Sequence, residues 1–274
     1  MSRLDGVLAI AGQSFRESAR NRVLHALLAA MLLASGSAHV LAWVSGDDPL
    51  RRTKVVADLS LSALVLLGSL GAIFLGTNLV YQEVERRTVY VVLARPLGRG
   101  SFVAGKLLGL VAIVSLACLA MGVVALGTIW LAADPGSPPA WGKLLLAVLV
   151  TGLELAVLSA VALFFSVAAQ PIEGAVFAVV VAMAGHMTSS LKDLGAQLLR
   201  DAGPTPGLLL RGAVRGLDLL YVLLPDLEHF NLRSHAVHDL GLDPWRLLLA
   251  PAYAAVWIAI LLGLSVLVFR RRIL

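Results

Sequence analysis

LLGLVAIVSLACLAMGVVALGTIWLAA, residues 107–133, contains no Asp, Glu, Lys or Arg. A helix needs roughly 20 apolar residues to cross about 30 Å of hydrocarbon, and its backbone groups must be hydrogen-bonded within the segment. The stretch therefore predicts a membrane-spanning helix. Five further stretches have the same character, although the third of them contains one charged residue, Glu154: residues 23–46, 59–82, 144–171, 174–191 and 247–269.

The composition supports an all-α integral membrane protein with six transmembrane helices in a single domain, residues 1–274. Hydrophobic residues make up 59% of the chain and charged residues 14%, whereas a soluble domain carries about 25% charged residues. The apolar side chains are therefore expected to contact membrane lipid. The net charge is +5, but the basic residues flank the apolar stretches and no basic patch has interleaved aromatic residues. We therefore expect no nucleic-acid partner.

The basic residues also predict the topology. They gather before the first apolar stretch, between the second and third, and after the sixth: Arg3, Arg16, Arg20, Arg22, Arg86, Arg87, Arg95, Arg99, Lys106, Arg270, Arg271 and Arg272. With six spans these regions share one side, and the positive-inside rule makes that side cytoplasmic. We expect both termini and residues 83–106 in the cytoplasm, and residues 192–246 in an extracytoplasmic loop.

Two amphipathic helices are expected outside the spans. In residues 2–20, apolar residues recur at helical spacing, which is typical of a helix lying at the cytoplasmic interface. In the long loop, Arg211, Arg215 and Asp218 fall on one face of a predicted helix over residues 209–220, opposite leucines. That helix is expected on the outer membrane surface or partly inserted in it.

GSFVAGKL, residues 100–107, is close to a phosphate-binding loop. Such a loop needs a strand before it, and a Ser or Thr after the lysine to hold Mg²⁺. Leu107 occupies the hydroxyl position, and the residues that follow form an apolar span. We therefore expect no nucleotide-binding domain and no enzymatic activity in this chain. Gly105 and Gly109 instead form a small-xxx-small pair suited to close helix contact, with Lys106 at the membrane boundary.

The preceding segment carries a family resemblance. YQEVERRTVYVVLARPLGRGSFVAGK, residues 81–106, resembles the cytoplasmic signature of ABC-2 type transporter permeases: acidic residues, a Thr, an apolar stretch, a Pro, an Arg, and a Lys that opens the third span. The matching positions are Glu83, Glu85, Thr88, Pro96, Arg99 and Lys106. Arg87 departs from the pattern, because the family usually has a small residue there.

A second resemblance lies downstream. LLYVLLPDLEHFNL, residues 219–232, is similar to a stretch before the last span in one branch of these permeases. That branch includes the permease of the copper-delivery exporter for nitrous-oxide reductase. The basic residues Arg270, Arg271 and Arg272 near the C-terminus also agree with this resemblance.

The resemblance implies an ABC-2 (type V exporter-like) architecture in the bacterial cytoplasmic membrane. It implies a dimer of permeases with two cytosolic ATPase subunits, which bind ATP and Mg²⁺. The connection after the second span would act as a coupling helix inserted into the ATPase, through charged and apolar residues of its sequence: Glu83, Glu85, Arg86, Thr88, Tyr90, Leu93, Arg95, Pro96 and Arg99. The alternative is a solvated charged loop between two helices.

Glu154 is the unusual residue of the spans. A charge at the bilayer centre costs about 2.5–3.5 kcal/mol on insertion scales, so it should face the bundle interior, be paired or be protonated. It either lines the translocation path or is a structural group. It also supports one alternative function, an ion-coupled secondary transporter. An intramembrane enzyme is a further alternative, but the serines in the spans have no evident catalytic partner.

The histidines allow two weaker alternatives. His229, His235 and His238 lie near acidic residues in the long loop, where a metal site is conceivable. His39 and His186 lie in spans and could in principle ligate haem. Without a repeated ligand motif, ordinary hydrogen-bonding roles explain all five, and we expect no metal site.

Overall fold

The computed structural model describes residues 3–46, 48–80, 98–201 and 207–272. Within these ranges the chain is helical and contains no strand, apart from an isolated bridge between Asp134 and Ser137. The elements are α1 (Arg3–Ala19), α2 (Arg22–Val44), α3 (Pro49–Leu79), α6 (Arg99–Ala132), α7 (Trp141–Ala168), α8 (Pro171–Asp201), α9 (Leu208–Leu223), η1 (Leu227–Phe230), α10 (Arg233–Val237) and α11 (Pro244–Arg272).

Six of the described helices are long and apolar enough to cross a membrane: α2, α3, α6, α7, α8 over Pro171–Thr188, and α11. This confirms the predicted all-α, six-span class. The helices extend beyond the predicted spans, because α6 begins at Arg99 and α8 continues to Asp201. Residues 99–106, expected in the cytoplasmic connection, and residues 192–201, expected in the long loop, are therefore helical. Charged residues mark where the hydrocarbon region ends. A helix can continue beyond that point, and it ends at the residues that satisfy its terminal backbone groups.

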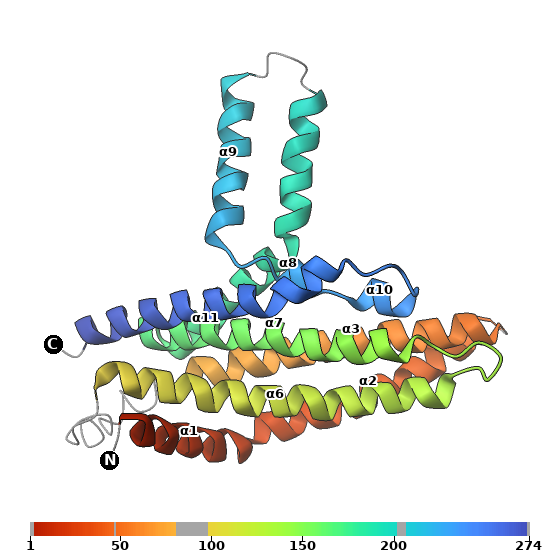
Figure 1. The fold of residues 1–274 in the computed structure, drawn as a ribbon, viewed down its shortest axis with the longest axis horizontal. Coiled ribbons are helices and arrows are strands. Elements are labelled where there is room, and N and C mark those ends of the chain that lie inside the picture. The colour runs from red at the N-terminus through yellow and green to blue at the C-terminus, as the bar shows by residue number, and fades with distance from the viewer. Residues whose placement is uncertain (1–2, 47, 81–97, 202–206, 273–274) are drawn as a thin grey trace.

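Helix α7 is the centre of the bundle (Figure 1). It packs against α3, α6, α8 and α11. In its most apolar 18-residue stretch 72% of the residues are buried, against 22% in the corresponding stretches of α2 and α11. A helix that is apolar on all sides is suited to such a place. The charged residue of the fourth span, Glu154, is consequently carried by the innermost helix.

The bundle has two distinct ends. Both termini of the chain lie at one of them (Figure 1), together with the C-terminus of α3 and the N-terminus of α6; we call this the termini end. The opposite, loop end carries the α2–α3 and α6–α7 connections. There Asp48 caps α3 by accepting a hydrogen bond from the backbone N–H of Leu50 at 3.1 Å, and Pro49 occupies the first helical turn.

At the termini end, α1 packs directly on α6. A Cβ atom at Gly105 would lie 2.8 Å from the Cβ of Ile10, and one at Gly109 would lie 2.5 Å from the carbonyl oxygen of Ala11. The predicted small-residue pair thus makes a close helix contact, and α1 is its partner. The apolar residues Leu4 and Leu8 of α1 remain exposed.

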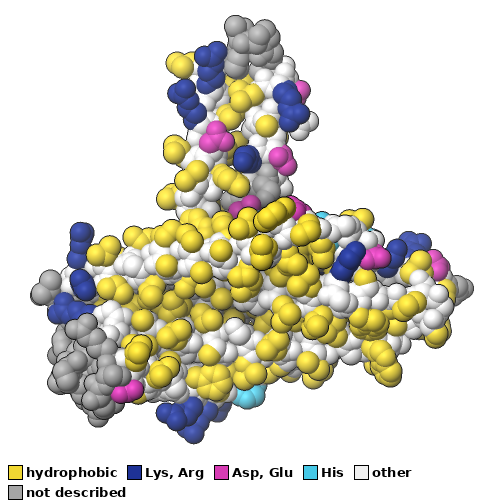
Figure 2. Space-filling view, viewed as in Figure 1, with side chains coloured by type: hydrophobic (Ala, Val, Ile, Leu, Met, Phe, Trp, Pro, Cys, Tyr) yellow, Lys and Arg dark blue, Asp and Glu magenta, His cyan; other side chains and the backbone are white. Residues whose placement is uncertain are grey.

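Beyond the bundle, α9 and the part of α8 that follows Thr188 form a hairpin that stands away from the other helices (Figure 1). Lys192 Nζ lies 4.4 Å from the ring centroid of Tyr221, and a Cβ at Gly195 would lie 3.5 Å from Val214. Helix α9 covers the predicted amphipathic segment. Figure 2 shows mostly apolar side chains over the flank of the bundle, and charged ones on the hairpin, towards the bundle ends and in one basic cluster at the lower edge.

Candidate functional site

A cavity of about 520 Å³ lies between α3 and α8, with Glu154 of α7 at its base. We call it the α3–α8 groove. Its side walls are mostly apolar and include Leu66 and Leu70 of α3, and Val179 and Met183 of α8. Leu66 and Met183 are 62% and 63% exposed, so the groove opens sideways onto the apolar perimeter of the bundle.

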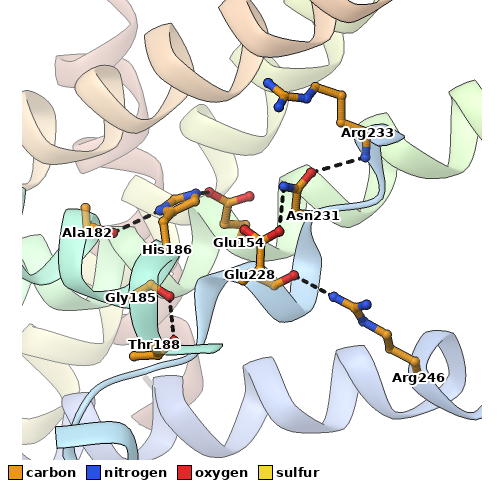
Figure 3. A network of polar contacts seen from close by, with 9 residues as sticks. All are labelled: Glu154, Ala182, Gly185, His186, Thr188, Glu228, Asn231, Arg233 and Arg246. Atoms are coloured by element: carbon orange, nitrogen blue, oxygen red, sulfur yellow. Dashed lines mark hydrogen bonds and ion pairs between the residues drawn. The ribbon is translucent and has the colours of Figure 1, made fainter. Parts of the chain in front are cut away.

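Glu154 and His186 form an ion pair at the base of the groove (Figure 3). Glu154 is 1% exposed, and its Oε1 lies 3.1 Å from Nε2 of His186. The other ring nitrogen, Nδ1, lies 2.9 Å from the carbonyl oxygen of Ala182. A carbonyl only accepts, so Nδ1 carries a proton.

The short contact favours a total charge of zero for this pair, because an uncompensated charge on a span is costly. With Nδ1 protonated, either an imidazolium ion faces a Glu154 carboxylate, or a neutral ring faces a protonated Glu154. Both arrangements have a net charge of zero, which explains how two ionisable groups are tolerated on spans.

The segment that follows Pro225 closes the groove towards the loop end; we call residues 225–233 the roof. Glu228 Oε1 accepts a hydrogen bond from Asn231 Nδ2 at 2.9 Å, and Asn231 Oδ1 accepts one from the backbone N–H of Arg233 at 3.2 Å. Gly185 of α8 lets the roof approach, because a Cβ there would lie 2.7 Å from the carbonyl oxygen of Pro225. Glu228, Asn231 and Arg233 line the groove.

Three helices hold the roof in place. From α11, Arg246 donates to the carbonyl oxygens of Glu228 and His229 at 2.6 and 3.1 Å. From α8, Thr188 donates to Asp226 Oδ1 at 3.0 Å. From α3, Asp58 pairs with Arg233, with Oδ1 and Nε 3.3 Å apart. The roof is therefore a fixed polar lid over an apolar groove.

His229 is a packing residue of the roof. Its ring centroid lies 5.2 Å from that of Tyr253 and 5.8 Å from that of Phe230. Burial, and secondarily the positive charge of Arg246, lowers the pKa of His229, so the ring is neutral near pH 7. Across the described ranges, no three His, Cys, Asp or Glu side chains come together as a possible metal-binding group.

The family model for ABC-2 family transporter proteins matches residues 8–274 of the chain. The chain belongs to this family. It is therefore the membrane subunit, or permease, of an ABC transporter, and the family implies an ATPase partner and a lipid environment. The ion-coupled alternative gives way to this assignment. No curated protein matched the chain.

Most residues predicted to couple the permease to an ATPase lie outside the described residues: Glu83, Glu85, Arg86, Thr88, Tyr90, Leu93, Arg95 and Pro96. Arg99 is the first residue of α6, and its Nη1 donates to the carbonyl oxygen of Arg270 at 3.4 Å, at the termini end. Lys106 of the same family signature is 1% exposed, with Nζ 3.7 Å from Glu17 Oε2 of α1.

The permease structure also answers the other predictions about single residues. Glu154 faces the interior, is paired with His186 and lines the groove, and its place on a translocation path stays a prediction. His39 lines a different cavity, beside Trp43 and Arg52, and is not brought to His186. Ser159 donates to the Leu155 carbonyl oxygen of its own helix at 2.7 Å, which is a structural role. Sequence reasoning did not identify His186, Glu228 and Arg246 as site residues.

Proposed function

We propose that two copies of this permease and two cytosolic ABC ATPase subunits form an exporter in the bacterial cytoplasmic membrane. The ATPases bind ATP and Mg²⁺, and the permease supplies the path. The family assignment carries the proposal, together with the placement of the charged family signature between α3 and α6.

The distribution of basic residues supports cytoplasmic termini. Arg99 lies in the first turn of α6, and Arg270 and Arg271 lie in the last turn of α11, all at the termini end. A cluster of lysine and arginine side chains is visible there in Figure 2. The positive-inside rule supports a cytoplasmic location for this end, and in that topology a cytosolic ATPase could reach the connection between α3 and α6.

The packing suggests how ATP hydrolysis would act on the groove. The connection of residues 80–98 joins α3 to α6, and both helices pack on α7. Helix α3 also forms one wall of the groove. Closure of the ATPases would therefore displace the connection, shift α3 against α7 and α8, and change the width of the groove.

The direction of transport, and the branch of the family that the chain resembles, belong to the same proposal. The roof over the groove lies towards the loop end, which is extracytoplasmic in this topology, so its release would discharge substrate outwards. The roof also falls within residues 219–232, the stretch that resembles the permease of the copper-delivery exporter. That resemblance supports export as the direction.

Purification of the full-length chain from its native membranes tests this function. We expect an ATPase with Walker A and Walker B motifs to copurify, and charge reversal by Glu83→Lys, Glu85→Lys and Arg95→Glu to remove it. The matched control is Arg51→Glu, an exposed arginine at the loop end, which should keep the ATPase. An ATPase retained at the wild-type level by the triple variant would contradict the proposed docking site.

A further inference from the structure

We propose that the α3–α8 groove binds hydrophobic monovalent cations, with the apolar part of the ligand between α3 and α8 and the positive charge beside Glu228. This names the substrate class of the permease, and in that respect it rests on the proposed function.

The shape and the walls of the groove set the apolar requirement. Its volume is about 520 Å³, within the range of roughly 300–1,000 Å³ typical of small-molecule sites. The flanking residues Val65, Leu66, Leu70, Val179 and Met183 carry no charge. Because the groove opens on the apolar perimeter, a ligand dissolved in the bilayer can enter it without crossing water.

The charged residues around the groove determine which sign of charge the ligand should carry. The Glu154–His186 pair is neutral in either of the two protonation arrangements described above. Arg233 is matched by Asp58, with 3.3 Å between Nε and Oδ1. Arg246 directs its guanidinium to the backbone carbonyls of Glu228 and His229, and it is not part of the groove wall. Glu228 lines the groove and is in no ion pair with a described residue, so its carboxylate is the wall charge that no direct contact neutralises.

The polar groups of the groove also favour a donor or a cation over an anion. Glu228 accepts one hydrogen bond, at Oε1 from Asn231, and Asn231 Oδ1 is already occupied by the backbone N–H of Arg233. Glu154 Oε1 is within ion-pair distance of His186 but in no hydrogen-bond geometry with any described group. Glu228 is half-buried, and a carboxylate with unused acceptor capacity beside apolar walls attracts a positive charge, since solvent screens it less than at an open surface.

Two lipophilic ions of the same shape and opposite charge test the inference: tetraphenylphosphonium, a cation, and tetraphenylborate, an anion. Equilibrium binding is measured on the purified full-length permease in lipid nanodiscs, with empty nanodiscs subtracted. We expect saturable binding of tetraphenylphosphonium, close to one per chain, and no saturable binding of tetraphenylborate.

Variants assign the binding to the groove. Glu228→Gln should weaken tetraphenylphosphonium binding at least tenfold, whereas Glu173→Gln, the same change at an exposed residue of α8, should leave it unchanged. Leu66→Trp fills the open side of the groove from an exposed position and should also weaken binding. Thermal unfolding of each variant shows that it is folded.

The inference is overturned if tetraphenylphosphonium binds no more than to empty nanodiscs, if both ions bind equally, or if Glu228→Gln binds as the wild type does. No ATPase is present in this measurement. A failure here therefore leaves the docking of the ATPase standing, and copurification of an ATPase without cation binding would separate the two proposals.

Discussion

The two ends of the bundle are held together by opposite kinds of contact. At the termini end, Gly105 and Gly109 bring α6 against the backbone of α1, and a Cβ at Gly76 would lie 2.5 Å from the Cβ of Ala162. At the loop end, the roof is held by hydrogen bonds and ion pairs from Arg246, Thr188 and Asp58. Close packing at small residues predominates in the contacts compared at the termini end, and polar contacts predominate at the roof.

The difference follows from what each end must position. Lipid is as apolar as leucine, so helices in a membrane associate through close contact of small residues. The roof, by contrast, contains non-helical backbone, whose polar groups need partners at this depth. Substitutions that add volume should therefore be most damaging at the termini end, and substitutions that remove polar groups should be most damaging at the loop end.

The largest effect is expected for Gly109→Val. The new side chain would collide with the Ala11 carbonyl and Ser14 of α1, and overpacking of this kind costs about 3 kcal/mol, at the upper end of its range. Thermal unfolding in detergent, followed by gel filtration, measures the loss of stability. Gly127→Val is the matched control in the same helix, because no atom lies within 4 Å of a Cβ there. Equal destabilisation by both variants would contradict the close α1–α6 contact.

Arg246→Met should come next, with a loss of about 2 kcal/mol. It removes two charge-assisted hydrogen bonds and leaves the carbonyl oxygens of Glu228 and His229 without them, and hydrogen bonds to charged groups contribute about 1.5–3 kcal/mol. Unfolding temperature and protease sensitivity of the roof are the readouts. Arg215→Met, on an exposed face of α9, is the control. A variant as stable as this control would show that the clamp does not hold the roof.

Asp58→Asn should have a smaller effect, up to about 1 kcal/mol, because its pair with Arg233 is partly exposed and partly screened. The same substitution removes the ion-pair partner of Arg233 and leaves an uncompensated positive charge beside the groove. Tetraphenylphosphonium binding should therefore weaken even though stability hardly changes. Unaltered binding in Asp58→Asn, with Asp193→Asn on the hairpin as control, would argue against the charge balance described for the groove.

The smallest effect is expected for Ser69→Ala. The hydroxyl oxygen of Ser69 is buried beside the groove and has no hydrogen-bond partner among the described residues, so its removal should change stability by about 0 kcal/mol. Ser166→Ala is the informative comparison, since Ser166 Oγ accepts from the backbone N–H of Val80 at 3.0 Å. That variant should lose about 1 kcal/mol in chemical unfolding. A reversed order would mean that Ser69 has a role the structure does not show.

The spans were predictable because the bilayer imposes a simple rule of length and apolarity, which all six helices obey. Glu154 could be singled out for the same reason, as the one charge that breaks the rule. The packing face of α1 was not predictable from its apolar residues. Leu4 and Leu8 are exposed, whereas Ile10 and the small residues Ser14 and Ser18 are buried, because in lipid the close contact of small groups, not apolarity, selects the interface.

The groove itself could not be predicted from the sequence. The pairing of Glu154 with His186 depends on the rotation of α7 and α8 about their axes, and neither residue has a spacing signal that indicates the other. The roof depends on contacts from helices distant in sequence, such as Arg246 of α11. The family signature, by contrast, could be recognised locally, although its residues 83–96 lie outside the described part of the chain.

The central claim is that the connection between α3 and α6 meets an ATPase in the cytoplasm. Cysteine labelling in intact cells tests it most directly, in a Cys118→Ser background that removes the one native thiol. With a membrane-impermeant maleimide, Gly241→Cys at the loop end should be labelled at once. Arg95→Cys should be labelled only after the cells are permeabilised, and more slowly when the ATPase is bound. Labelling of Arg95→Cys in intact cells would place the connection outside and contradict the account.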